Sequence, residues 1–278
     1  MAGSIAADEV LALAGPLRAG AHLQGTPVGR RLGGGAAATG LPLLYAGHEV
    51  AIVTAVGDDE TGAWLVQELA RAGAATGGVA RVQGSSTHSL VLLDPRGERT
   101  VLNLHRCREP EPPERLLRLP ADCLYVRSRD LEMAPLIAER ARMCRVVAHV
   151  PPVAAGARRA HVLLASASDL APEALANPWA LGREIAGDVL EWFVVTRGMA
   201  GAEAYSSDRK LSVGAASVEV ADTTGAGDAF AAGLVHALVS GAPMEGALRT
   251  AVAWGTASVG CRSSVLPRSE VERLLSAA

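Results

Sequence analysis

Short apolar runs alternate along this chain with longer stretches in which apolar residues recur at helical spacing. The clearest run, Val50–Val56, is continuous rather than alternating, as expected for a strand buried on both faces of a sheet. The turn at Gly57–Gly62 leads from it into a predicted helix over Ala63–Ala72, which Gly73 ends. Repetition of this strand–helix unit predicts an α/β fold with a mostly parallel central sheet.

A predicted β-hairpin interrupts the alternation. Its strands are His88–Asp94 and Arg99–Leu104, and Pro95–Glu98 forms the turn between them. A hairpin at this point belongs more naturally to a small accessory sheet than to a parallel one. We therefore expect a small β lid built from about residues 8–35 and 85–108.

The alternation then resumes. Short apolar strands are expected over Cys123–Val126, Val146–Val150, Val162–Ala165 and Trp192–Thr196. The last third predicts one strand and two Ala-rich helices, over Ser212–Val220, Ala226–Val239 and Met244–Gly260.

Charge and cysteine content narrow the function. The 278 residues carry 26 Lys+Arg against 29 Asp+Glu, a net charge of −3, which gives no electrostatic reason to expect nucleic acid or an anionic membrane. No signal peptide and no apolar run of about 18 residues is present, so the sequence predicts no membrane span. The four cysteines lack Cys-x-x-Cys spacing, which favours free thiols and a cytoplasmic protein. A small-molecule site is the leading expectation.

Lysine is nearly absent. Lys210 is the only one, and it lies in Ser-Asp-Arg-Lys-Leu, which is neither the Gly-Lys-Ser/Thr of a Walker P-loop nor the strand context of a protein-kinase lysine. Both of these nucleotide-binding schemes are excluded.

The glycine-bearing turn that ends at Asp228 is the most informative stretch. A strand is expected to end at Asp222 and a helix to begin at about Ala226, whose first free N–H groups make an anion site. Gly225 and Gly227 would let a phosphate approach the backbone. A carboxylate at this place would repel the anion unless it deprotonates an attacking hydroxyl. On spacing alone, Asp228 could equally be a helix-dipole partner and the glycines a tight turn.

The same segment resembles the motif of a known family. Asp222–Asp228, which reads Asp-Thr-Thr-Gly-Ala-Gly-Asp, resembles the signature of the ribokinase-like, or PfkB, carbohydrate kinases. Further segments resemble family motifs in family order: Gly33–Ala38, Val53–Gly62, Leu92–Thr100, and Val195–Gly198 with Gly201. The resemblance implies a ribokinase-like three-layer sandwich with a central, mostly parallel sheet and a small β lid, as a single domain over residues 1–278.

The resemblance also implies an activity, the ATP-dependent transfer of the γ-phosphoryl group to a hydroxyl of a sugar or nucleoside. Asp228 would be the catalytic base, and the amides of Gly225, Ala226 and Gly227 would form the anion hole. The nucleotide-binding residues implied are Thr196, Gly198, Thr223, Gly225 and Gly227. This agrees with the chemistry, because phosphoryl transfer relies mostly on positioning and electrostatic stabilisation.

At the acceptor end, Asp8 matches the aspartate of the family's Gly-x-x-x-x-Asp motif, and a carboxylate accepts two hydrogen bonds from a vicinal diol. Gly34 and Gly35 would let the backbone approach the sugar. Ala38 lies in the Ala-Ala-Ala-Thr stretch where the family usually has an asparagine, so the acceptor cannot be copied from other members. An ordinary cap role for Asp8 and a flexible turn for the glycines stay open.

The metal motif also departs from the family. Its Asn-x-x-Glu aligns best with Ser166–Asp169, so Asp169 would hold Mg²⁺ while Ser166 is a weaker ligand or a helix cap. Asp222 would help to build a monovalent-cation loop, as in some members. The strand that precedes Gly3 is almost missing: either Ser4–Ala7 replaces it or the chain as given starts late.

Several expectations remain open. One rival is a catalytically impaired sugar- or nucleotide-binding homologue, supported by the lost asparagines and opposed by the intact Asp222–Asp228 segment. A second rival is a kinase acting on a sugar phosphate, for which basic side chains would have to converge on the acceptor: Arg30, Arg31, Arg99 or Arg106. Arg30 and Arg31 are otherwise solvated loop charges. His149 and His161 are expected to be satisfied core or edge residues. Lid strands often pair between subunits in such families, so a homodimer through the lid is expected.

Overall fold

The computed structural model describes residues 1–277, which pack as two compact units. Unit 1 takes residues 1–2, 111–217 and 230–253. Unit 2 takes residues 3–110, 218–229 and the chain from residue 254 onward. The expectation of a single domain over the whole chain stays a prediction.

A seven-stranded sheet forms the centre of unit 1, in the order β1-β8-β9-β10-β11-β12-β13. The strands are β1 (Ala2–Gly3), β8 (Cys123–Arg127), β9 (Arg145–Val150), β10 (Val162–Ser166), β11 (Trp192–Thr196), β12 (Ala202–Tyr205) and β13 (Lys210–Val213). Strands β8 to β11 are parallel, and β12 and β13 continue the sheet antiparallel. Five of the six residues of β9 are buried, as a continuous apolar run in a parallel sheet requires. The four strands predicted between residues 123 and 196 are confirmed.

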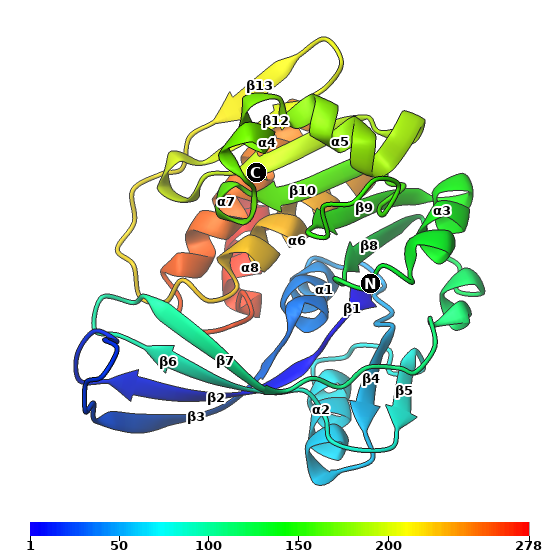
Figure 1. The fold of residues 1–278 in the computed structure, drawn as a ribbon. Helices are drawn as coiled ribbons and strands as arrows, with labels where there is room; N and C mark the ends of the chain where they lie inside the picture. The colour runs from blue at the N-terminus through cyan, green and yellow to red at the C-terminus, as the bar shows by residue number, and fades with distance from the viewer. Residues whose placement is uncertain (278) are drawn as a thin grey trace. The chain divides into compact units, whose positions relative to one another are not determined.

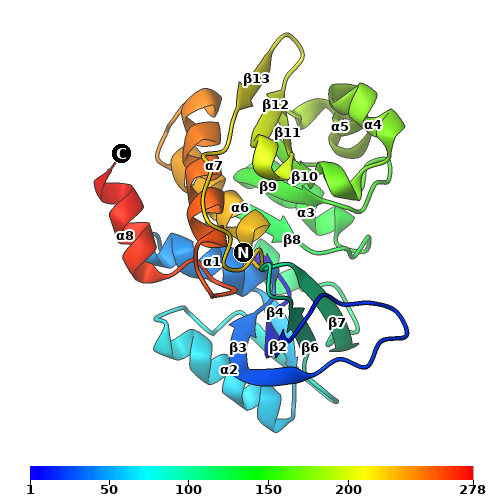
Figure 2. The same cartoon turned by 90° about the vertical axis from the view of Figure 1, so that its left-hand side faces the viewer.

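Helices cover both faces of this sheet. Figure 2 shows α3 and α5 on one side of the strands and the parts of α6 and α7 that belong to unit 1 on the other. The helices are α3 (Ala134–Met143), α4 (Pro172–Ala176), α5 (Pro178–Ala186), α6 (Ala226–Val239) and α7 (Met244–Val259). The three layers and the bounds of both Ala-rich helices agree with the sequence predictions.

Unit 2 contains a separate four-stranded sheet in the order β3-β2-β6-β7, whose strands lie side by side in Figure 1. They are β2 (Ala6–Leu13), β3 (Gly25–Gly33), β6 (His88–Leu93) and β7 (Arg99–His105). Strands β6 and β7 pair antiparallel around the turn at 94–98, so the predicted hairpin is confirmed. Strand β2 joins it in parallel to β6 and antiparallel to β3. A small accessory sheet therefore exists in the expected residues; its action as a lid stays a prediction.

The other elements of unit 2 are β4 (Thr54–Gly57), β5 (Val79–Val82), α1 (Gly35–Tyr45), α2 (Glu60–Arg71) and α8 (Arg268–Ser276). Strands β4 and β5 form a two-stranded parallel sheet. Helix α8 lies beside α1 in Figure 2, and Arg268 stacks on the ring of Tyr45 at 4.6 Å. Helix α2 begins three residues earlier than predicted, because the Asp59 carboxylate accepts the Gly62 N–H at 2.7 Å and caps the helix.

Two predicted strands are wrong in extent. Only Val213 and the residue before it belong to the strand expected over Ser212–Val220, since residues 214–220 have no strand partner and the side chains of Val218 and Val220 are exposed. The expected strand end at Asp222 is therefore also wrong: its N–H and that of Ala221 donate to the Val259 carbonyl at the end of α7.

The run at 50–56 forms a strand only from Thr54 onward. Earlier in the run, Ala51 makes a single isolated bridge to Ala75. Within residues 1–277, no helix combines the length and the apolar character that a membrane span needs.

Candidate active site

The Asp8 carboxylate lies directly over a glycine. Asp8 on β2 faces Arg31 on β3 across the antiparallel ladder, and Gly33 is two residues further along β3. A Cβ built on Gly33 would overlap Oδ2 of Asp8 and lie 2.5 Å from its Cγ. Glycine at position 33 therefore makes room for the carboxylate itself.

Burial sets the charge state of Asp8. The residue is 7% exposed, and this desolvation raises the pKa of its carboxyl from 3.8 to about 6. A hydrogen bond from Ser89 opposes the shift, as do the charges of Arg31, His88 and Arg99. Ser89 is the register partner of Asp8 on β6, so the two side chains share one face of the sheet. These contacts place a buried carboxylate among several basic groups.

The glycine turn that opens α1 packs against the segment before β2. Gly34 has φ +87°, and a Cβ at this position would lie 2.5 Å from the Ser4 carbonyl oxygen and 2.6 Å from Ile5 Cα. Gly35 is the first residue of α1, and the N–H of Ala36 donates to the Ser4 carbonyl at 3.0 Å. Ala38 is buried within the first turn, and its N–H donates to Gly34. The turn and Asp8 are thus brought together in unit 2.

The second glycine turn precedes α6, which begins at Ala226 as predicted. Gly225 has φ +80°, and a Cβ there would lie 3.0 Å from the Ser264 carbonyl carbon. Gly227 is exposed, and a Cβ on it would meet nothing within 4 Å. Asp228 is half-buried in the first helical turn, where main-chain N–H groups lack partners within the helix. The Ala226 N–H makes a long bond of 3.4 Å to the Thr223 carbonyl.

Asp222 is completely buried and forms an ion pair that the sequence did not predict. Its Oδ2 lies 3.1 Å from Nη1 of Arg31, and its Oδ1 accepts the Thr224 N–H at 2.8 Å. The partners are 191 residues apart, so no local sequence pattern could have indicated the pair. Arg31 is therefore not a solvated loop charge, because one of its guanidinium nitrogens is held by Asp222.

The loop before α6 also contacts the β6–β7 turn. Both the N–H and the Oγ1 of Thr223 donate to the Gly97 carbonyl, at 3.3 and 3.4 Å. Thr223, an expected nucleotide-binding residue, is therefore anchored to the hairpin.

The other residues expected to bind the nucleotide lie in unit 1. Thr196 ends β11, and its Oγ1 donates to the Ala165 carbonyl at 3.4 Å. Gly198 has φ +55° and open space around its Cα. Arg197, between them, pairs with Glu203, which also binds Lys210 at 2.6 Å. The single lysine, Lys210 on β13, is thus an ion-pair partner of Glu203 on β12.

The segment at Ser166–Asp169 forms a short 3-10 helix that Ser166 caps. Its Oγ accepts the Ser168 N–H at 3.3 Å and bonds the Ser168 hydroxyl at 2.7 Å. Asp169 is exposed. No three acidic, histidine or cysteine side chains gather as a metal site within the described residues. A lone accessible carboxylate still fits Mg²⁺, which keeps several waters and needs one or two carboxylates beside substrate phosphates.

The other candidate side chains have structural partners. His149 bonds Arg127 at 3.0 Å, and burial lowers the pKa of its ring to about 2, while His161 accepts the Val146 N–H at 3.0 Å. Both histidines are satisfied, as expected. Arg30 stacks on Trp64 at 4.5 Å and donates to Thr61.

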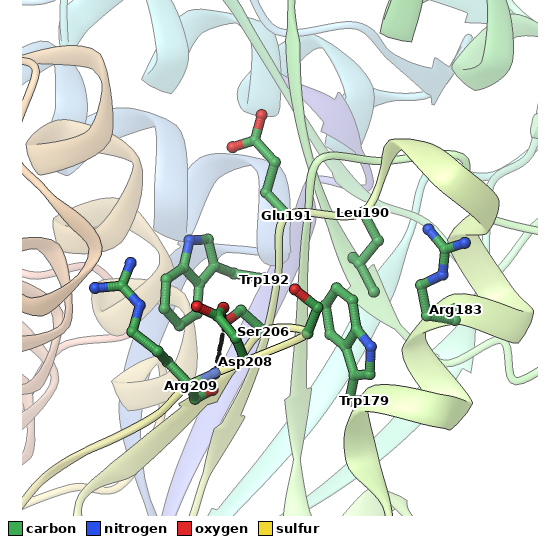
Figure 3. A pocket seen from close by; sticks show the side chains of 9 residues that line it. Trp179, Arg183, Leu190, Glu191, Trp192, Ser206, Asp208 and Arg209 are labelled. Atoms are coloured by element: carbon green, nitrogen blue, oxygen red, sulfur yellow. Dashed lines mark hydrogen bonds between the residues drawn. The ribbon is translucent and has the colours of Figure 1, made fainter.

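A hollow of about 590 Å³ in unit 1 contains none of the predicted site residues. Figure 3 shows it between Trp179 of α5, Trp192 at the start of β11 and the turn that carries Asp208. Thr196 is at the opposite end of β11. This hollow is therefore separate from the nucleotide-side residues of the same unit.

A comparison with family models matches residues 5–270 to the family described as pfkB family carbohydrate kinase. A relative from Halopiger xanaduensis, an ATP-dependent ribose-1-phosphate kinase, is 29% identical over 83% of this chain and 82% of its own. The nucleoside kinase of Burkholderia thailandensis, solved with inosine, superposes with a TM-score of 0.78 at 18% identity over 99% of this chain and 96% of its own. The ribokinase of Cryptococcus neoformans, solved with ADP, gives 0.76 at 22% identity over 98% and 97%. These two likenesses identify the ribokinase fold.

Proposed function

The chain belongs to the pfkB family of carbohydrate kinases, and from this we propose that it transfers the γ-phosphoryl group of ATP to a hydroxyl of a sugar or nucleoside. The observation that carries the proposal is the turn before α6. Gly227 is exposed with open space above its Cα, and Asp228 follows in the same helical turn. A base beside an open anion site is the arrangement that in-line phosphoryl transfer needs.

In this mechanism Asp228 takes the proton of the attacking hydroxyl. The acceptor oxygen bonds to the γ-phosphorus as the bond to the β-phosphate oxygen breaks, which leaves ADP and the phosphorylated acceptor. The amides of Gly225, Ala226 and Gly227 stabilise the charge on the transferred group. Gly225 fits this role because its φ of +80° turns the backbone at the start of the helix.

Asp8 binds the acceptor hydroxyls, with the backbone of Gly34 and Gly35 beside it. The buried carboxylate accepts two hydroxyl donors when it is ionised. Ala38 contributes no polar group to acceptor recognition. Closure of the four-stranded sheet over the acceptor would exclude water from the transfer.

In unit 1, Thr196 and Gly198 would bind the nucleotide, and Asp169 would hold Mg²⁺, which would neutralise phosphate charge. Thr223 is the nucleotide-binding residue expected in unit 2. A monovalent-cation site near Asp222 is also part of the proposal. Three buried hydroxyls of unit 2 have no hydrogen-bond partner within the described chain: Thr224, Ser258 and Ser264. Such hydroxyls, with carbonyls nearby, are oxygen donors of the kind that these cations take.

A second candidate acceptor is a sugar phosphate. The charges of Arg31, His88 and Arg99 all act on Asp8, and Arg99 is exposed. The relative from Halopiger xanaduensis acts, by its name, on ribose 1-phosphate. Because Arg31 is paired with Asp222, Arg99 is the better candidate for contact with a phosphate.

A homodimer through the accessory sheet is also proposed. The edge strand β7 carries three exposed apolar side chains, Val101, Leu102 and Leu104. Exposed apolar side chains on an edge strand favour association with a second copy. Sedimentation equilibrium at micromolar concentration tests this proposal, and a monomer would contradict it.

The function is tested by acceptor-dependent ADP release with Mg-ATP over pentoses, hexoses, keto-deoxy sugar acids, sugar phosphates and nucleosides. Asp228→Asn is assayed beside the wild type. One strong acceptor that the variant cannot use supports the proposal and names the substrate. Silence across the panel, with thermal shifts on ligand addition still present, would instead support a binding homologue without turnover.

A further inference from the structure

One guanidinium in unit 2 pairs with a buried carboxylate and acts electrostatically on a second. Arg31 is the register partner of Asp8, and its charge acts on that carboxylate. The same side chain reaches Asp222, with 3.1 Å between Nη1 and Oδ2. The Asp222 side chain is 0% exposed and that of Arg31 is 19% exposed. Water therefore screens this pair weakly.

Asp222 connects this ion pair to the backbone of the anion-hole turn. Its second oxygen accepts the Thr224 N–H at 2.8 Å, and Gly225 follows directly. Removal of Arg31 would leave a buried carboxylate without its cation, free to change its hold on the Thr224 N–H. The orientation of the first anion-hole amide thus depends on a side chain from β3.

We propose that Arg31 is a positioning residue that couples acceptor binding at Asp8 to the geometry of the anion-hole turn. This inference rests on the proposed function. When acceptor hydroxyls donate to Asp8, they occupy the oxygens of that carboxylate, and the guanidinium is left to Asp222. The pair with Asp222 is already formed without an acceptor, and the turn is held more firmly when an acceptor is present.

The coupling has a chemical consequence for ATP. Without an acceptor, water can attack the γ-phosphorus and produce ADP and inorganic phosphate. A turn that is held more firmly when the acceptor is bound suppresses this reaction relative to transfer. Arg31 therefore sets the ratio of acceptor-dependent to acceptor-independent ADP release.

The test compares Arg31→Gln and Arg31→Lys with Arg30→Gln as the matched control. Arg30 is the neighbouring arginine on β3, but it contacts Thr61 and Trp64 rather than a carboxylate. Measured quantities are kcat, KM for ATP and for the acceptor, and the ADP-release ratio. We expect Arg31→Gln to lower kcat about 10- to 100-fold, the loss of one charged hydrogen bond, and to lower the ratio. KM for ATP changes less than about twofold, Arg31→Lys recovers part of kcat, and Arg30→Gln behaves as wild type.

A purely structural ion pair makes a different prediction. Because Arg31→Gln leaves the buried Asp222 unpaired and so destabilises the chain, the double variant Arg31→Gln/Asp222→Asn removes both charges. A positioning role leaves this double variant folded by thermal melting but still low in kcat. Recovery of kcat in the double variant, or an unchanged ADP-release ratio in Arg31→Gln, would overturn the proposal. Absence of turnover by the wild type with every acceptor would instead overturn the proposed function.

Discussion

Two glycine turns open helices in unit 2, and they use their glycines differently. In the turn before α1, Gly33 makes room for the Asp8 carboxylate and Gly34 for the Ser4 carbonyl. In the turn before α6, Gly225 likewise makes room for Ser264, but nothing lies within 4 Å of a Cβ on Gly227. The first turn is filled by the protein, whereas the second keeps one position open.

The difference between the two turns shows two separate reasons why a glycine occupies a position. A glycine pressed by protein atoms fixes the positions of neighbouring groups, here a carboxylate and a strand. A glycine with empty space around it, in ordinary helical backbone, gains nothing from its missing side chain within the chain itself. Its small size is then best explained by a ligand. This contrast supports the proposal that the first turn prepares the acceptor carboxylate and that the second admits the phosphoryl group.

Asp228→Asn is the most severe test of the roles proposed for the two turns, because it removes the proposed base and leaves both turns in place. We expect kcat to fall by about 10²–10⁴, the range for loss of a general base, with little change in nucleotide binding. Single-turnover kinetics and calorimetry with ATP measure the two effects. An unchanged kcat would rule out Asp228 as the base.

Gly33→Ala tests the turn before α1, which is filled by protein atoms. Its methyl would displace the Asp8 carboxylate, so KM for the acceptor should rise about 10- to 100-fold, as expected for loss of hydrogen bonds to a charged group. Gly77→Ala is the control, since a Cβ at that glycine has no neighbour within 4 Å. Equal kinetics for the two variants would show that Asp8 does not hold the acceptor.

A change of pH tests the same carboxylate without a substitution at the glycine. Burial raises the pKa of Asp8 to about 6, so KM for the acceptor should fall several-fold as pH rises through about 6 and the carboxylate ionises. The folded chain binds more protons than the unfolded chain between pH 3.8 and about 6, so stability falls as pH rises through this window. Asp8→Asn should therefore raise Tm at pH 8 but not at pH 3. A pH-independent KM in the wild type would contradict the assignment.

Gly227→Ala probes the open position and has the smallest expected effect on the fold. Alanine is the better helix former, so stability should rise by up to about 1 kcal/mol, while kcat falls because a methyl group lies where the phosphoryl group approaches. Gly225→Ala is the contrasting variant, because its φ of +80° and its contact with Ser264 predict a loss of stability. Thermal melts and kcat for both variants decide the comparison. Full activity in Gly227→Ala would contradict the inference that the open space at Gly227 admits the phosphoryl group.

Much of this arrangement could be predicted because it is local in sequence. The β6–β7 hairpin follows from turn residues between two apolar runs, and α6 begins at Ala226 where the glycine turn ends. The parallel strands of unit 1 are continuous apolar runs that only a doubly covered sheet accommodates. The role of Asp228 came from the family motif rather than from the spacing.

The features that the sequence did not predict depend on contacts between distant segments. Val218 and Val220 alternate with polar residues as in a strand, but no neighbouring strand is available and both side chains are exposed. The Arg31–Asp222 pair joins β3 to the loop before α6, and only the folded chain brings them together. Ser166, whose pattern left a ligand and a cap open, caps the short helix that contains Asp169.

The single lysine offers a practical handle. Because Lys210 is the only lysine and more than half of its side chain is exposed, an amine-reactive dye has one side chain to label. Its ion pair with Glu203 raises the pKa of the ammonium group, so labelling should speed up at alkaline pH. The attached dye would report from the β12–β13 hairpin, which follows the turn proposed to bind the nucleotide, without any engineered cysteine.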